Sequence, residues 1–92
     1  MENNLKQYKV KKRIRVITTN TVITDTDFSD WSAINTGTTA VQVDKVTLQP
    51  SEGIPFMGLL PNVKYDSTIQ IIIPDGGEVV MYQLLYKEII NV

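Results

Sequence analysis

Asp25, Asp27 and Asp30 form the only acidic cluster in this chain, and they lie in a segment of turn-favouring residues. Carboxylate oxygens in such a loop are the ligands that hard cations such as Ca²⁺ prefer. An EF-hand loop beginning at Asp25 would need glycine at position six and glutamate at position twelve, where this chain has Asp30 and Thr36. Short acidic side chains also stabilise turns and cap helices, which explains the cluster more simply. We therefore expect a structural role, with a loop cation as the alternative.

Most hydrolytic chemistry is excluded by the residue types alone. The 92 residues contain no histidine and no cysteine, so the chain cannot form a Ser-His-Asp or Cys-His nucleophile pair, or an ordinary structural zinc site. It also lacks the G-x-G-x-x-G and G-x-x-x-x-G-K-[ST] motifs that bind phosphates. Two carboxylates could still hydrolyse a glycoside, but they would need a substantial cleft between them, for which a domain this small has little room. We expect a protein that is not an enzyme and holds no cofactor.

Basic residues are concentrated near the amino terminus. Residues 1–15 hold six basic residues and one acid, a net charge of +5, while the remainder holds three basic and nine acidic residues, a net charge of −6. This segregation would let the basic segment bind an acidic surface on another molecule, or nucleic acid. The alternative is an edge strand that lysines protect from aggregation. The six basic residues are Lys6, Lys9, Lys11, Lys12, Arg13 and Arg15.

The elements that must position these residues have the pattern of β-strands. Apolar and polar residues alternate over residues 8–18 and 68–73, and no window longer than about ten residues has helical periodicity. A chain of this length buries only roughly 60 to 65% of its unfolded surface, which supports one core. The sequence predicts an all-β fold, a small antiparallel β-sandwich of jelly-roll or immunoglobulin-like type over residues 13–92, preceded by a basic arm over residues 1–12. Shorter β-type runs occupy residues 21–24, 31–35, 40–44 and 45–49.

Two glycine-containing turns are expected to form hairpins. Thr36-Gly37-Thr38 should reverse the chain between residues 31–35 and 40–44. Pro74-Asp75-Gly76-Gly77 suits a type I turn followed by a left-handed glycine, which would make a tight hairpin into the last strand.

Two further segments have local predictions. A kink or bulge near Asp44-Lys45 should switch the inward-facing positions from odd to even numbers. Residues 25–30 could form one helical turn, with Phe28 and Trp31 packed on one side of it.

The final run, residues 78–90, is long and apolar on both faces. Its thirteen residues would span roughly 43 Å as a strand, so the run should bend or extend beyond its own sandwich. A thin domain covers only one face of such a strand, so we expect a neighbouring subunit over the second row. Cover by the chain's own loops is the alternative. One row is Val79, Met81, Leu85 and Ile89, and the other is Val80, Tyr82, Leu84, Tyr86 and Ile90.

The composition is that of a soluble globular domain, with 42% hydrophobic and 21% charged residues. No stretch approaches the roughly 20 apolar residues needed to cross a bilayer, and no apolar segment follows the basic residues as a secretory signal would require. We expect no membrane association and synthesis in a cytoplasm. Without cysteine no disulfide stabilises the domain, so homo-oligomerisation is the expected substitute.

The stretch Ile34-Asn35-Thr36-Gly37-Thr38, followed by Val41 to Leu48 and the turn Pro50-Ser51-Glu52-Gly53, carries a resemblance to a known group. Over residues 14–90 the order of β runs and turns resembles small β-sandwich structural proteins of tailed bacteriophages, in which an I-x-N-T-G-T-x-x-V hairpin precedes an L-x-P-G-E turn. The resemblance implies a capsid-decorating, head-fibre-anchoring or neck protein of the virion, made in the host cytoplasm. Such a protein binds copies of itself and other virion proteins without turnover.

The resulting expectation is a non-enzymatic virion structural protein. The first alternative is a carbohydrate- or surface-binding module that uses exposed aromatic residues such as Trp31 and Tyr65. The second is a nucleic-acid-binding protein that uses residues 6–15. It is the weaker one, because Tyr8 is the only aromatic residue near the basic ones and the sequence pI is about 5.2. The predicted partner-binding residues combine the basic segment with apolar and aromatic anchors: Lys6, Lys9, Lys11, Lys12, Arg13, Arg15, Phe56, Met57, Leu59, Leu60, Tyr82 and Tyr86.

Overall fold

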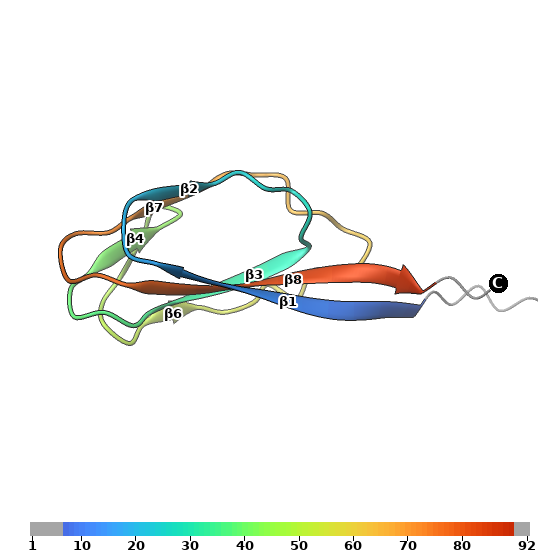
Figure 1. Ribbon diagram of the computed structural model, residues 1–92, viewed down its shortest axis with the longest axis horizontal. Helices are drawn as coiled ribbons and strands as arrows, with labels where there is room; N and C mark the ends of the chain where they lie inside the picture. Colours follow the sequence, from blue (N-terminus) through green and yellow to red (C-terminus); the bar gives the residue numbers. More distant parts are fainter. Residues whose placement is uncertain (1–6, 90–92) are drawn as a thin grey trace, which may run out of the picture.

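The computed structural model describes residues 7–89, which form strands and loops and no helix (Figure 1). Eight strands in this range form two four-stranded antiparallel sheets. The prediction of an all-β fold with antiparallel sheets is confirmed. The strands are β1 (Gln7–Ile17), β2 (Thr21–Ile23), β3 (Asp30–Asn35), β4 (Val41–Val43), β5 (Val46–Leu48), β6 (Gly53–Ile54), β7 (Ile69–Ile72) and β8 (Val79–Ile89).

The two sheets share one scheme of pairing. Sheet A has the strand order β1-β8-β3-β6, and sheet B has the order β2-β7-β4-β5. The first strand therefore pairs with the eighth, the second with the seventh, the third with the sixth and the fourth with the fifth. Apart from the β4–β5 hairpin, each strand is followed by a strand of the other sheet, so the chain repeatedly crosses between the two layers.

Two turns predicted as hairpins instead connect the two sheets, and those predictions were wrong. Thr36-Gly37-Thr38 leads from β3 in sheet A to β4 in sheet B, and Pro74–Gly77 leads from β7 in sheet B to β8 in sheet A. The two turns lie against each other, since a Cβ added to Gly37 would lie 2.5 Å from the backbone nitrogen of Glu78. The backbone N–H of Thr36 donates to the Glu78 carbonyl at 2.9 Å. Turn residues predict where the chain reverses, but they do not determine which strand the following strand pairs with.

Asp44 and Lys45 form a two-residue hairpin in place of the predicted kink or bulge. Val43 pairs with Val46 across the turn, and the φ angles of Asp44 and Lys45 are 50° and 69°. Positive φ at both central residues is the geometry of a type I′ turn, whose twist matches that of the strands it joins. The switch of inward-facing positions from odd to even numbers follows directly from this two-residue reversal.

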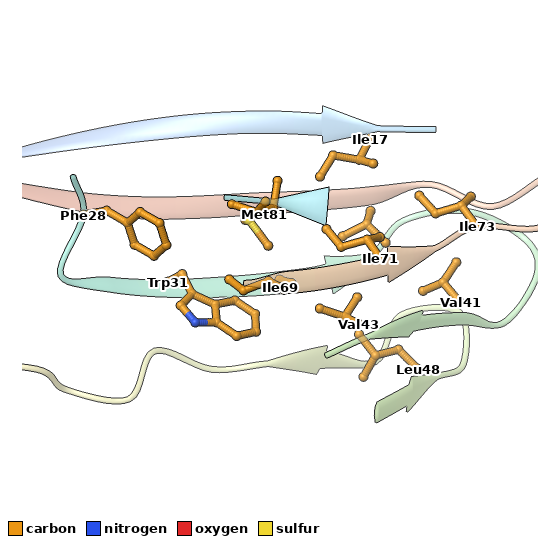
Figure 2. Packing of buried hydrophobic residues seen from close by; sticks show 13 residues of the cluster. Ile17, Phe28, Trp31, Val41, Val43, Leu48, Ile69, Ile71, Ile73 and Met81 are labelled. Carbon is orange, nitrogen blue, oxygen red and sulfur yellow. The ribbon is translucent and has the colours of Figure 1, made fainter. Parts of the chain in front are cut away.

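The core lies between the two sheets (Figure 2). Residues 25–29 form no helical turn, but Phe28 and Trp31 both reach the core, where they are 0% and 2% exposed. Tyr65 joins them, since its ring stacks on Phe28 with centroids 5.6 Å apart and meets Trp31 edge-on at 6.1 Å. The buried apolar residues are Ile17, Ile23, Phe28, Trp31, Ala33, Val41, Val43, Leu48, Ile69, Ile71, Ile73, Val79 and Met81.

Strands β1 and β8 continue beyond the sandwich as a two-stranded ribbon. They pair from Ile17–Val79 to Gln7–Ile89, whereas β3 pairs with β8 only as far as Leu84. The ribbon accounts for the elongated shape, which measures 58 × 22 × 18 Å (Figure 1). The final run was predicted to bend or to extend beyond its own sandwich, and the pairing confirms the extension.

The predicted basic arm, residues 1–12, falls partly within this ribbon. Residues 7–12 form the first half of β1 and are paired with β8. Lys6 and the other residues before Gln7 lie outside the described range.

Candidate functional site

The side of sheet A that faces away from sheet B, here called the outer face of sheet A, is largely apolar and is exposed along β1 in the described residues. On β1, the side chains of Val10, Ile14 and Val16 are 59%, 56% and 63% exposed. The neighbouring row on β8, which includes Tyr82 and Tyr86, is half-buried. Strand β3 extends the face through Ile34, which is 38% exposed and pairs with Val80. Among residues 7–89, the second apolar row of the final run therefore lies on the surface.

Aromatic contacts hold the outer side of the ribbon in place. The ring of Tyr8 meets the ring of Tyr86 edge-on, with centroids 6.5 Å apart. The ammonium of Lys12 lies 5.2 Å from the centre of the Tyr82 ring, within the range of a cation–π contact. Three of the predicted partner-binding residues, Lys12, Tyr82 and Tyr86, thus lie together on one face.

Asp30 organises the loop that follows β6. Its carboxylate is buried and accepts hydrogen bonds from the backbone N–H groups of Met57 at 2.9 Å, Gly58 at 2.7 Å and Leu59 at 3.0 Å. These bonds fix the loop backbone. Its apolar side chains remain at the surface, with Phe56 40%, Met57 48% and Leu60 64% exposed, while Leu59 is half-buried.

A shallow groove of about 430 Å³ joins this loop to the outer face of sheet A. Ile34 and Tyr82 belong to both surfaces, and Phe56 lines the groove with them. The structure therefore brings Phe56 and Tyr82 to one groove, although 26 positions separate them in the sequence. The residues that line it are Ser32, Ala33, Ile34, Gly53, Ile54, Pro55, Phe56 and Tyr82.

Two of the predicted docking residues, Arg13 and Arg15, face the other way and form ion pairs within the chain. Arg13 Nη2 binds Asp25 Oδ2 at 2.5 Å and Asp27 Oδ1 at 2.8 Å. Arg15 Nη2 binds Asp25 Oδ1 at 3.0 Å. Both arginines lie at odd positions of β1, on the same side as the core residue Ile17. They attach the base of the ribbon to the segment that connects β2 and β3.

Gln83 completes this network, and the sequence analysis did not single it out. Its side chain is fully buried. Its amide oxygen accepts from Arg13 Nε at 2.8 Å and from Arg15 Nε at 2.9 Å, and its amide nitrogen donates to Asp25 Oδ2 at 2.9 Å. The available signal was a polar residue at position 83 within the inward apolar row of Val79, Met81 and Leu85.

Attachment of the ribbon should weaken in acid. The hydrogen bond from Arg13 lowers the pKa of Asp27 below its ordinary 3.8, and the same bond raises the pKa of Arg13. A carboxylate whose pKa is lowered by folding contributes stability that is complete above its unfolded pKa and is lost as the pH falls through its folded pKa. Between about pH 5 and about pH 3, the free energy of unfolding measured in urea should decrease more for the wild type than for Asp27→Asn. Equal decreases would contradict this role for Asp27.

The arrangement of the acidic cluster leaves each carboxylate with protein partners. Asp25 and Asp27 bind arginine, and Asp30 binds backbone amides elsewhere. Within residues 7–89, no group of three or more His, Cys, Asp or Glu side chains is placed to hold a metal ion. Trp31, one of the aromatic residues considered for sugar binding, is 2% exposed and lies in the core.

Comparisons with known proteins identify no relative. No family model matches the chain, and no curated protein or solved structure matches it either. In the part of the chain that the structure describes, no helix is long and apolar enough to cross a membrane.

Proposed function

We propose that this chain is a non-enzymatic structural subunit of a bacteriophage virion, a capsid-decorating or neck component. It acts by assembling with copies of itself and with other virion proteins. The observation that carries the proposal is the outer face of sheet A, where exposed apolar side chains extend from Val10 on the ribbon to Ile34 on β3, with Lys12 among them. Large contiguous apolar surfaces on a small soluble domain mark sites of interaction.

The strand order is compatible with this proposal. We infer that the orders β1-β8-β3-β6 and β2-β7-β4-β5 are those of an eight-stranded jelly roll, in which two Greek keys form the two sheets. Viral capsid domains and lectins both use this architecture. The architecture is therefore compatible with assembly and with sugar binding. The two functions are distinguished by which side chains the surface exposes.

The ribbon is the second reason to expect a covering partner. A two-stranded β-ribbon is at best marginally stable in water by itself, and residues 85–89 of β8 pair only with β1 in the described chain. A specific interface buries about 800 Å² on each partner. We propose that a neighbouring virion subunit covers the apolar rows of β1 and β8 and so completes the layer that the ribbon lacks.

Serine substitutions on the outer face of sheet A test the proposed assembly. The double variant Ile14→Ser/Val16→Ser removes two exposed apolar side chains and should shift the sedimentation coefficient towards that of a monomer, even at high salt. The matched control is Val22→Ser/Val46→Ser, which changes two side chains that are 54% and 48% exposed on sheet B. If Ile14→Ser/Val16→Ser assembles as well as Val22→Ser/Val46→Ser does, the outer face of sheet A is not the interface.

A carbohydrate-binding module is the second candidate function, and the groove beside Phe56 favours it. Phe56 and Tyr82 line this groove, where the two rings offer apolar surface and Tyr82 adds a hydroxyl that can form a hydrogen bond. Binding to a panel of immobilised glycans, lost in Phe56→Ala but kept in Val22→Ser, would favour this candidate. Absence of glycan binding together with self-assembly would favour the structural subunit.

A further inference from the structure

The inner side of the ribbon, which faces the same way as the core, is cationic. Lys9 and Lys87 lie directly opposite each other in the β1–β8 register, and Lys11 follows on the same side opposite Leu85. All three lysines are exposed. Among residues 7–89, none of the three forms an ion pair. Like charges directly across a strand pair destabilise it, so this arrangement has no stabilising role in the isolated chain.

The opposite end of the molecule is acidic. Four connecting segments meet there, as shown by the hydrogen bonds from Ser51 N to the Asn35 carbonyl and from Thr36 N to the Glu78 carbonyl. A further bond joins Ile73 N to the side chain of Asn20. The segments contain three acids, Glu52, Asp75 and Glu78, and no lysine or arginine; they are residues 18–20, 35–40, 49–53 and 74–78.

The two ends have equal and opposite formal charge. Residues 7–12 and 84–89 contain four lysines and Glu88, a net charge of +3, against −3 for the acidic end. The ribbon and the acidic turns lie at opposite ends of the long axis (Figure 1). Two acidic side chains at that end are also held in position, because Glu78 accepts from the Thr36 hydroxyl at 2.8 Å and Glu52 from Gln49 N at 2.7 Å.

We propose that the inner side of the ribbon of one copy binds the acidic end of a second copy, head to tail. This inference rests on the homo-oligomer of the proposed function and adds its geometry. Carboxylates from the second copy would lie between Lys9, Lys11 and Lys87 and remove their mutual repulsion. A ribbon-to-ribbon contact would instead bring lysines together, which is how edge strands prevent self-pairing. A head-to-tail contact produces a ring where its rotation closes and a filament where it does not.

Charge reversal tests the proposal. The ribbon variant Lys9→Glu/Lys11→Glu would place a carboxylate opposite Lys87, so it should unfold at a higher temperature than the wild type while its head-to-tail affinity falls about tenfold or more. The turn variant Glu52→Lys/Asp75→Lys should lose the same association. An equimolar mixture of the two should recover it, because each supplies the end that the other lacks. The control, Thr47→Lys/Gln70→Lys, adds two positive charges to the exposed side of sheet B and should assemble as the wild type does.

Sedimentation velocity at about 0.05 M and about 0.5 M salt separates the outcomes, since exposed charges are screened at the higher ionic strength. The proposal expects larger wild-type assemblies at low salt and recovery only in the mixture. If the wild type assembles equally at both salt concentrations, and the ribbon variant assembles as the wild type does, the head-to-tail contact is overturned while the proposed function stands. A monomer at both salt concentrations would overturn both. Binding of the wild type only to another acidic protein would overturn the choice of a second copy.

Discussion

Replacing Gln83 with leucine should lower the free energy of unfolding by about 1 to 3 kcal/mol, because one partner of three partly buried, charge-assisted hydrogen bonds is removed. Gln83 is fully buried and bridges Arg13, Arg15 and Asp25. Leucine has a similar size, so the space remains filled while the bonds to both arginines are lost. Urea unfolding followed by circular dichroism measures the effect.

The matched control for this variant is Gln70→Leu, which changes an exposed glutamine on β7. It should stay within about 0.5 kcal/mol of the wild type, as surface substitutions usually do. Hydrogen exchange adds a local measurement, because loss of the Gln83 network should speed exchange in β1 more than in sheet B. Similar stabilities for the two variants would show that the network does not hold the ribbon to the sandwich.

Replacing Asp30 with alanine should destabilise the protein by about 2 to 3 kcal/mol, because the buried carboxylate satisfies several backbone donors. The N–H groups of Met57, Gly58 and Leu59 all donate to it, and the Trp31 N–H donates at 2.8 Å. Loss of these bonds should release the loop that presents Phe56 and Leu60. Amide exchange at residues 57–59 measures this release directly.

Asp66→Ala is the control for the loop experiment, since Asp66 is an exposed aspartate later in the same connection between β6 and β7. It should leave the exchange rates of residues 57–59 unchanged. Protection of these amides that persists in Asp30→Ala would mean that the loop is ordered by its own packing. In that case the exposed side chains of the loop would keep their positions without the carboxylate.

Local patterns in the sequence were sufficient to predict every strand within residues 7–89 except β6, and the two rows of side chains on β8. Val79 and Met81 are buried while Val80 and Tyr82 are half-buried, as alternation with a period of two requires. The length of the final run predicted that it would either bend or leave the sandwich, and the pairing shows that it leaves the sandwich. These predictions depend on neighbouring residues in one strand, where the pleat alone decides the direction of each side chain.

The pairing of distant segments could not be predicted in the same way. The turn at Gly37 has hairpin composition, but its contact with Glu78 carries the chain into the other sheet. Arg13 was assigned to a docking surface because its charge belongs to a basic run, while its partners Asp25 and Gln83 lie 12 and 70 positions away. In the sequence alone, Gln83 only interrupts an apolar row of β8. Its role becomes clear once the structure shows which charged groups it binds.

Among residues 7–89, strands β1 and β8 have sheet B on one side only. The network of Gln83 holds the base of the ribbon, and Asp30 holds the apolar loop beside the groove. Apolar side chains on the outer face of sheet A and lysines on the inner side of the ribbon are left for other molecules. The proposed assembly would use the outer face of sheet A for an apolar contact and the inner side of the ribbon for a charged one.

The molar mass of the purified wild-type chain in solution tests this account most directly. Sedimentation equilibrium at roughly 10 μM would detect a contact of micromolar or tighter affinity. The account predicts a mass that is a multiple of 10.4 kDa and that decreases in Ile14→Ser/Val16→Ser. A single species of 10.4 kDa at every concentration and salt would contradict it.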